Sequence, residues 1–140
     1  MSQQSNPKSQ SVRLGYVIVY VPEVQGAVDF YGHAFGIQPR FVHETGQYAE
    51  LETGATVLAF ADETSTTSTP DVFEPNRASR KAAGAEVALV VEDVPAAFAR
   101  ALGAGATPVV EPVAKPWGQV ICYVRDLNGF LVELCTEVGA

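Results

Sequence analysis

An internal repeat with an offset of seventy residues constrains this chain more than any other feature. The run Val17–Val24 (VIVYVPEV) is echoed by Val87–Val94 (VALVVEDV), and each run continues into residues with helical spacing. Three short strand patterns follow in each half, so the order strand, helix, strand, strand, strand occurs twice. This order predicts an α+β fold that consists of two βαβββ modules.

Both expected helices show one apolar stripe, because apolar residues recur every three or four positions. The stripes are formed by Val24, Ala27, Val28, Tyr31 and Phe35 in the first half and by Val94, Ala97, Phe98, Ala101 and Leu102 in the second. Gly36 and Gly103 are expected just beyond the helix ends, and Asp93 is a suitable N-cap for the second helix.

The remaining strand patterns are short and separated by turn residues. We expect them at Pro39–Thr45, Tyr48–Glu52 and Thr56–Ala61 in the first half, and at Thr107–Val113, Gln119–Arg125 and Leu131–Thr136 in the second. The last hairpin turns at Asn128-Gly129, a residue pair that strongly favours a two-residue hairpin turn.

The repeat also sets the expected domain organisation. Residues 12–61 and 85–138 form the two modules of a single domain that spans 12–140. The Thr-, Ser- and Pro-rich segment 62–84 is expected to be a connecting loop. Residues 1–11 are polar and lack an apolar core segment, so they are expected to be a disordered tail.

Alternating side chains give each strand two faces. On the first strand, Tyr16, Ile18 and Tyr20 point away from the side that the helix would cover. Counting four residues on from Gly54 reaches Leu58, and the same count from Gly129 reaches Glu133. By this reasoning Leu58 and Phe60 lie on the same face of the sheet as Tyr16, Ile18 and Tyr20. Since one helix covers only one face of its sheet, we expect the remaining faces to enclose a shared cavity.

Composition excludes some classes of partner and location. Sixteen acidic against nine basic residues give a net charge of −7, which argues against nucleic acid and anionic membranes as partners. The apolar runs are far shorter than the ~20 residues of a membrane span. The two cysteines, Cys122 and Cys135, lie in apolar strand patterns and do not resemble a disulfide framework. A reducing, cytoplasmic location is expected.

Two motifs carry a resemblance to a known family. They are the segment Val21–Ile37, which contains VPEV, DFY and FGI, and the closing segment Tyr123–Glu133 (YVRDLNGFLVE). The sequence from Leu14 to Val138 resembles the vicinal oxygen chelate superfamily, which includes glyoxalase I, type I extradiol dioxygenases, fosfomycin-resistance enzymes and bleomycin-resistance proteins. The resemblance implies a curved mixed sheet around a cavity, the glyoxalase/bleomycin-resistance fold, and a homodimer. Leu127 stands where the extradiol signature usually has proline.

The resemblance also implies where metal ligands would lie, namely on the first and last strands of each module. Carried over to this chain, those positions are Tyr16, Leu58, Glu86 and Glu133. Leu58 has no donor atom and a neutral phenol is a poor ligand, so we expect no catalytic transition metal. If a divalent metal ion were nevertheless bound, Glu133 and Glu86 would be its ligands.

Glu133, Tyr123 and Glu86 are the candidate catalytic residues. Glu133 is a lone charge within an apolar strand, where burial is costly without a partner. It could be retained for structural reasons, hydrogen-bonded to Tyr123 or Tyr16, or it could contact a ligand. If Glu86 and Glu133 share the cavity, their repulsion would raise one pKa and create an acid–base pair.

The expected ligand-binding residues are mostly apolar or aromatic. They are Tyr16, Ile18, Tyr20, Leu58, Phe60 and Trp117. Trp117 belongs to a Pro-Trp-Gly run that resembles one in bleomycin-resistance proteins, where the aromatic side chain helps to line the drug cleft. Such a wall suits a planar ligand.

Three functions remain open from the sequence. The first is a bleomycin-resistance-like protein that binds a small aromatic or cationic molecule without a transition metal. The second is a metal-dependent enzyme of the same superfamily, either a lyase or isomerase similar to lactoylglutathione lyase or an extradiol-type dioxygenase. The third is a metal-free enzyme that uses Glu133 or Glu86 to move a proton next to a carbonyl group. Whether the chain is catalytic stays undecided at this stage.

Overall fold

The computed structural model describes residues 9–64 and 72–139, so most of the expected tail lies outside the described residues. The chain has the α+β architecture that the repeat predicts, with the order β-α-β-β-β occurring twice. The first module contains β1 (Tyr16–Val21), α1 (Val24–Phe35), β2 (Pro39–Val42), β3 (Tyr48–Leu51) and β4 (Val57–Asp62). The second contains β5 (Glu86–Val90), α2 (Val94–Gly103), β6 (Thr107–Ala114), β7 (Val120–Arg125) and β8 (Leu131–Cys135).

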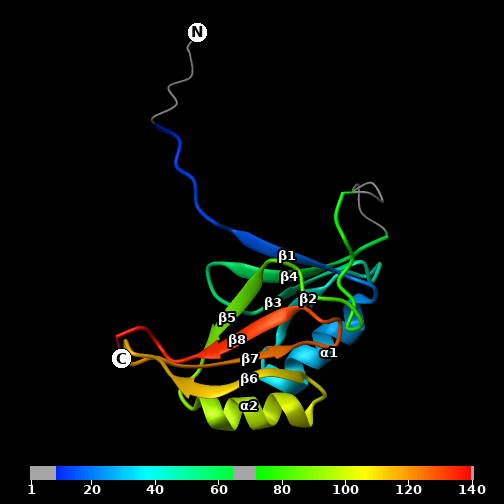
Figure 1. Ribbon diagram of the computed structural model, residues 1–140. Helices are drawn as coiled ribbons and strands as arrows, with labels where there is room; N and C mark the ends of the chain where they lie inside the picture. Colours follow the sequence, from blue (N-terminus) through cyan, green and yellow to red (C-terminus); the bar gives the residue numbers. More distant parts are fainter. Residues whose placement is uncertain (1–8, 65–71, 140) are drawn as a thin grey trace.

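Each module forms its own four-stranded mixed sheet, in the orders β1-β4-β3-β2 and β5-β8-β7-β6 (Figure 1). The first and last strands of each module are parallel neighbours, and the other pairs are antiparallel. The outermost strands are irregular. β2 begins at Pro39 and its pairing shifts register, and β6 contains Pro108 and Pro112 together with two register shifts.

Capping groups define the helix ends. The Glu23 carboxylate accepts hydrogen bonds from the first backbone N–H groups of α1, and Asp93 caps α2 as predicted. Gly36 ends α1 with a φ of 72°, a left-handed conformation that favours glycine. In the second module the prediction was off by one residue, because Gly103 is the last residue of α2. The positive φ lies two residues later, at Gly105.

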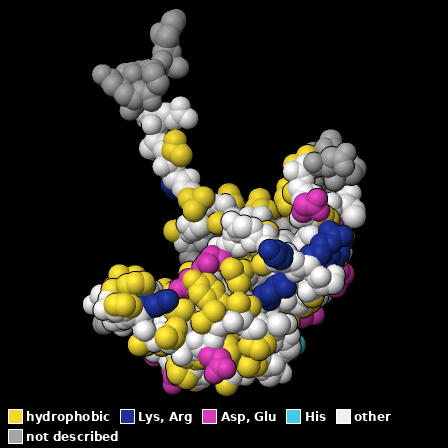
Figure 2. All heavy atoms as spheres, in the orientation of Figure 1, with side chains coloured by type: hydrophobic (Ala, Val, Ile, Leu, Met, Phe, Trp, Pro, Cys, Tyr) yellow, Lys and Arg dark blue, Asp and Glu magenta, His cyan; other side chains and the backbone are white. Residues whose placement is uncertain are grey.

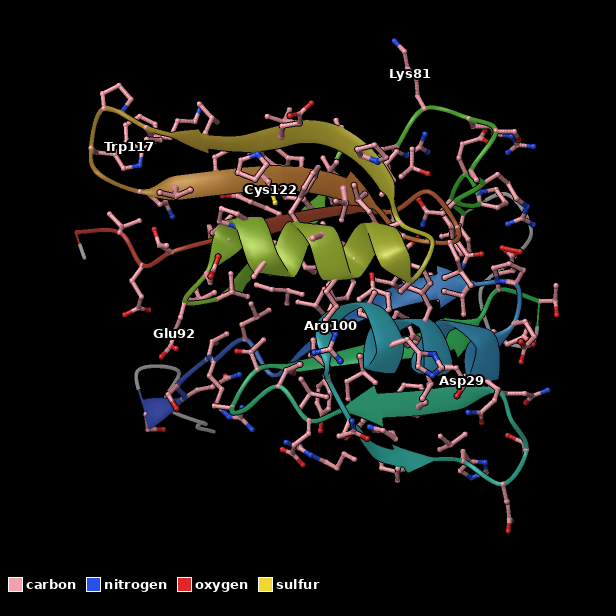
Figure 3. All side chains as sticks on the ribbon, turned by 90° about the horizontal axis from the view of Figure 1, so that it is seen from below. Asp29, Lys81, Glu92, Arg100, Trp117 and Cys122 are labelled. Atoms are coloured by element: carbon pink, nitrogen blue, oxygen red, sulfur yellow. The ribbon has the colours of Figure 1, made fainter. Side chains whose placement is uncertain are left out.

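The two modules share one hydrophobic core. Both helices lie next to each other, each against its own sheet, and Arg100 of α2 donates hydrogen bonds to the backbone carbonyls of Gly32 and His33 at the end of α1 (Figure 3). The core also contains the helix-facing side chains of both sheets, such as Val19 and Leu134. Because both helix-facing sides are buried in one core, the opposite faces of the sheets lie on the outside. We call these the open faces. In the described residues the two sheets are curved but do not close on each other.

The predicted turn at Asn128-Gly129 is present and tightly packed. Asp126, which is 3% exposed, accepts hydrogen bonds from the backbone N–H groups of Asn128 and Phe130. Gly129 has a φ of 85°, and a Cβ atom there would lie 2.7 Å from the carbonyl oxygen of Arg77. Glycine is thus required both by conformation and by the close approach of the connecting segment.

Within residues 9–64 and 72–139, the structure contains no helix that is both long and apolar enough to cross a membrane.

Candidate functional site

The three candidate catalytic residues lie together on the open face of the second module. Tyr123 of β7 is directly opposite Glu133 of β8, and Glu133 is also the partner of Ala88 in β5. Glu86 begins the same strand two residues earlier, and it hydrogen-bonds to Glu133. The structure therefore brings together side chains from three adjacent strands, as strand alternation predicts.

The surroundings change the acidity of this cluster. Desolvation, the hydrogen bond to Glu133 and the negative charge of Glu133 together raise the pKa of Glu86 to about 7. Desolvation and the hydrogen bond to Glu133 raise the pKa of Tyr123 to about 12. Near neutral pH, Glu86 can therefore hold or release a proton next to Glu133, while Tyr123 remains a hydrogen-bond donor. Such a pair can bind a cation or exchange a proton with a ligand.

The open face of the first module is apolar and aromatic. Tyr16 and Ile18 are 55% and 45% exposed, as expected for β1 side chains that point away from the core. Tyr20 lies on the same face and stacks on Phe73 of the connecting segment, with 4.4 Å between the ring centroids. The described end of the connecting segment thus covers one end of this face.

Leu58 and Phe60 do not lie on the open face, which corrects the prediction made for them. Both belong to the core on the helix side, and Phe60 is 0% exposed with its ring 4.9 Å from that of Tyr31. In the parallel β1–β4 pair, Ile18 is opposite Ala59. The residues of β4 that share the open face are therefore Val57, Ala59 and Ala61.

Leu58 and Phe60 were assigned to the wrong face because Gly54 was aligned with Gly129. Five residues separate β3 from β4 and five separate β7 from β8, so position 54 corresponds to position 128 and not to Gly129. Gly54 and Gly129 both have positive φ, but they occupy different positions within turns of equal length. The β4 residue that corresponds to Glu133 is consequently Ala59 rather than Leu58.

Three residues of the first open face were missed at the sequence level, namely Phe41, Tyr48 and Glu50. The Tyr48 hydroxyl donates a hydrogen bond of 2.9 Å to Glu50, and both side chains alternate with the buried Ala49 and Leu51. Desolvation and the hydrogen bond to Glu50 raise the pKa of Tyr48 to about 12. Phe41 lies beside this pair, with its ring centroid 6.0 Å from that of Tyr48. The alternation of Tyr48–Leu51 was the signal that could have revealed Tyr48 and Glu50.

Trp117 belongs to neither cluster, and its contact with a ligand stays a prediction. It lies in the tight turn between β6 and β7, at the far end of the hairpin, and is 57% exposed (Figure 3). Its indole N–H donates to the side chain of Gln119 at 2.9 Å, and the ammonium group of Lys115 lies 5.9 Å from its ring centroid. These contacts hold the indole on the turn.

A cavity of about 790 Å³ lies between the modules, along the free edge of β5. Of the predicted site residues, Glu86 and Leu58 line it. The other lining residues include Val17, Phe35, Ile37, Val87, Leu89, Ala97, Arg100 and Leu134. Hydrophobic side chains are visible at the surface between the modules (Figure 2). The cavity thus reaches the second cluster only through Glu86.

The positions expected for metal ligands do not fit a transition-metal centre. With the corrected register they are Tyr16, Ala59, Glu86 and Glu133, so one position has no donor atom. Among the residues that the structure describes, no three His, Cys, Asp or Glu side chains are grouped so that they could hold a metal ion. A first-row transition metal in a protein usually has at least three such ligands.

Comparison with known proteins supports the resemblance found in the motifs. The sequence model of the Glyoxalase/Bleomycin resistance protein/Dioxygenase superfamily matches residues 13–134. A glyoxalase-related enzyme from Fulvimarina pelagi is similar in structure with a TM-score of 0.75 at 20% identity, covering 89% of this chain and 88% of that one. TioX from Micromonospora sp. ML1 has a TM-score of 0.69 at 25% identity, covering 91% and 100%. The virulence protein STM3117 from Salmonella typhimurium has 0.67 at 19%, covering 92% and 99%. No curated protein matches the chain.

Proposed function

Because the chain belongs to the Glyoxalase/Bleomycin resistance protein/Dioxygenase superfamily, we propose that it binds a small planar cation without a catalytic transition metal. The observation that carries this proposal is the cluster of Glu86, Tyr123 and Glu133 on an open face. Two neighbouring carboxyl groups attract a positive charge, and the tyrosine hydroxyl can orient it. The corrected ligand positions, which include Ala59, support binding without a transition metal.

A second copy of the chain completes the binding site in this proposal. The open face of the first module in one copy covers the open face of the second module in the other. Exposed apolar side chains on both faces support this arrangement, since Tyr16 is 55% and Val90 is 57% exposed. Removing such side chains from water favours association. The family resemblance implies a homodimer, and a homodimer would likewise supply the second copy that completes the site.

The aromatic side chains of the first open face supply the planar surface. Tyr16, Phe41 and Tyr48 present ring faces or edges on the same side of the sheet. Aromatic rings attract both planar groups and cations, the latter through the negative charge on the ring face. An aromatic wall opposite two carboxyl groups therefore selects a planar cation over a planar anion.

One observation favours proton-transfer catalysis as a second candidate function. The pKa of about 7 for Glu86 is close to neutral pH, where a general acid or base is most effective. In that case Glu86 or Glu133 exchanges a proton with a carbonyl-containing ligand. Replacement of Glu133 by Gln would then abolish turnover of a substrate, a readout that simple binding does not have.

The binding proposal can be tested with permanently charged probes. Titration calorimetry with N-methyl-4-phenylpyridinium should show saturable binding, whereas the planar anion 4-phenylbenzoate should not bind. Glu133→Gln should weaken the cation at least tenfold. Glu92→Gln is the matched control, because Glu92 is exposed outside the cluster (Figure 3). Equal binding of cation and anion, or no effect of Glu133→Gln, would refute the proposal.

The metal part of the proposal has its own measurement. Elemental analysis of the purified protein should find less than one equivalent of zinc, nickel, iron and manganese combined. Chelation by EDTA should leave cation binding unchanged. One tightly held equivalent of a transition metal, with loss of binding after chelation, would favour the metal-dependent enzyme instead.

A further inference from the structure

The inner edge of the second sheet differs from the outer edges of both sheets. β5 is the edge strand of the second sheet nearest the first module, and among residues 9–64 and 72–139 only β8 pairs with it (Figure 1). The β5–β8 pairing keeps an unbroken register over all five residues of β5, and β5 contains no proline. The opposite edge strand, β6, contains Pro108 and Pro112 and two register shifts. The edge of β5 is therefore regular enough to pair with a further strand.

The backbone hydrogen bonds show which groups point to this free edge. The N–H of Val91 donates to the carbonyl oxygen of Cys135 at 2.8 Å, on the β8 side. In a parallel pair, the N–H and C=O groups of alternate residues point to the same neighbour, so the residues two and four positions earlier also face β8. The N–H and C=O groups of Glu86, Ala88 and Val90 consequently point away from β8, toward the free edge.

The cavity of about 790 Å³ lies along this edge, and all five residues of β5 line it. Val87 and Leu89 contribute apolar side chains on the helix side, and Ala97 of α2 and Leu134 of β8 extend the same apolar wall. The volume lies within the range of about 300–1,000 Å³ that is typical of ligand pockets. A ligand in this cavity would lie beside free backbone donors and acceptors and against an apolar wall.

The cavity also contains a cation. Arg100 is the one basic residue among the described residues that line it. Its guanidinium group donates to the carbonyl oxygens of His33 at 2.9 Å and Gly32 at 3.3 Å, and Nη1 lies 3.0 Å from where a Cβ atom of Gly36 would be. It forms no ion pair with a carboxylate in the described part of the chain. Since a guanidinium group has five N–H donors, donors remain for an anionic ligand.

The two acidic residues that line the cavity both have partners. Glu52 accepts a hydrogen bond from Arg40 at 2.7 Å, and Glu86 hydrogen-bonds to Glu133. Desolvation, together with the hydrogen bond and the charge of Glu133, raises the pKa of Glu86 to about 7, so most of this carboxyl group is protonated at pH 6. At that pH, Arg100 is the charge in the lining that lacks a counter-ion.

Each of these features selects one part of a ligand. A free strand edge pairs with backbone amide groups, an apolar wall packs against apolar side chains, and a guanidinium group binds a carboxylate. We propose that the cavity binds a short extended peptide that adds a strand to β5, with its C-terminal carboxylate on Arg100. This peptide site goes beyond the proposed function, which concerns the open faces, and it meets the cluster of Glu86, Tyr123 and Glu133 only at Glu86.

Peptides of one sequence can test both contacts in the wild-type chain. The probe is N-acetyl-Val-Thr-Val-Thr-Val with a free C-terminal carboxylate, and a second peptide ends in an amide. Calorimetric titration at pH 6 should show saturable binding of the probe and about tenfold weaker binding of the amide, which lacks the charge that Arg100 attracts. Equal affinities of the two peptides would overturn the contact with Arg100.

Two methylated peptides test the strand pairing. One carries N-methyl groups on both threonines, and the other carries them on the second and third valines. Because alternate N–H groups of a strand point to opposite sides, only one of these sets can face β5. One methylated peptide should therefore lose binding at least tenfold, while the other stays within threefold of the probe. An equal loss from both, or no loss from either, would overturn the strand addition.

Protein variants test the same contacts from the other side. Ala88→Pro removes an N–H at the free edge and leaves the β5–β8 ladder, so it should weaken the probe at least tenfold. Arg100→Gln should weaken the probe about tenfold and leave the affinity for the amide peptide unchanged. Arg80→Gln removes the same charge from the exposed connecting segment and should change neither affinity. Thermal unfolding of each variant checks that it is folded.

The remaining outcomes separate this inference from its alternatives. Failure of folded wild-type protein to bind the probe would overturn the peptide site and leave the planar-cation function intact, since that function does not involve the edge of β5. Light scattering measures the oligomeric state of the wild type and Ala88→Pro. If the variant dissociated a wild-type oligomer, a second copy of the chain would occupy the edge, and the peptide proposal would be wrong.

Discussion

The Tyr31 hydroxyl donates a hydrogen bond of 2.7 Å to Oδ2 of Asp126, and this bond joins helix α1 of the first module to the β7–β8 turn of the second. Tyr31 is 0% and Asp126 is 3% exposed. Burial and the neighbouring Asp126 raise the pKa of Tyr31 well above its usual value, so the phenol stays a donor. Both residues belong to the motifs that carry the family resemblance, and their contribution here is to hold the modules together.

We expect Tyr31→Phe to destabilise the fold by about 1–3 kcal/mol, because Asp126 loses its side-chain donor in a buried site. Urea unfolding followed by circular dichroism measures this change. Tyr16→Phe is the control, since Tyr16 is 55% exposed, and it should change the unfolding free energy by less than about 0.5 kcal/mol. If both variants were equally stable, the bond would contribute nothing to joining the modules.

The β7–β8 turn provides a second stability test. Gly46 and Gly129 both have positive φ, but only Gly129 has neighbours where a Cβ atom would be placed. We expect Gly46→Ala to cost about 1–2 kcal/mol from backbone strain alone. Gly129→Ala should cost at least about 1 kcal/mol more, because the methyl group would collide with the Arg77 carbonyl. If both variants lost the same free energy of unfolding, the connecting segment would be able to move away from the added methyl group at no cost.

The raised pKa of Glu86 predicts a pH dependence of stability. Its carboxyl group titrates at about 7 in the fold and at 4.5 in the unfolded chain, so between these values the folded state binds more protons than the unfolded state. Its contribution therefore becomes less favourable as pH rises from about 4.5 to about 7. Comparing urea midpoints of the wild type and Glu86→Gln at pH 5, 6, 7 and 8 isolates it. The variant should gain stability relative to the wild type as pH rises, and parallel curves would contradict the assignment.

The same titration should appear in binding. As pH rises through about 7, Glu86 becomes ionised beside Glu133, and the affinity for N-methyl-4-phenylpyridinium should increase severalfold between pH 6 and 8. The neighbouring Tyr123, with a pKa of about 12, does not titrate in this range. Glu86→Gln should remove the pH dependence and retain part of the affinity. A wild-type affinity that is constant from pH 6 to 8 would exclude Glu86 from the site.

The fold was predictable because the repeat appears in apolar residues, which determine the core. Strand alternation likewise placed Tyr16 and Glu133 on the open faces. The face of β4 was not predictable in this way, because all five residues Val57–Ala61 are buried and the strand shows no alternation. Aligning the turn glycines then shifted the register by one, and a shift of one residue exchanges the two faces of a strand.

The incomplete prediction of the site has a similar origin. Tyr48 and Glu50 lie on a strand of only four residues, and their pairing depends on how that strand sits against β4. The position of Trp117 depends on the length of the β6–β7 hairpin, which extends its turn away from the core. Sequence patterns describe which residues face the core more reliably than how far a hairpin projects.

The irregular outer strands have a consequence for solubility. Proline has no N–H to donate, so Pro108 and Pro112 leave gaps in the edge of β6, and the register shifts bend that edge further. In the other sheet, β2 is four residues long and begins at Pro39. A strand from a neighbouring molecule therefore cannot form a continuous ladder of backbone hydrogen bonds with β2 or with β6. Fibre growth by successive strand addition is disfavoured at both of them, even though both open faces carry exposed apolar side chains.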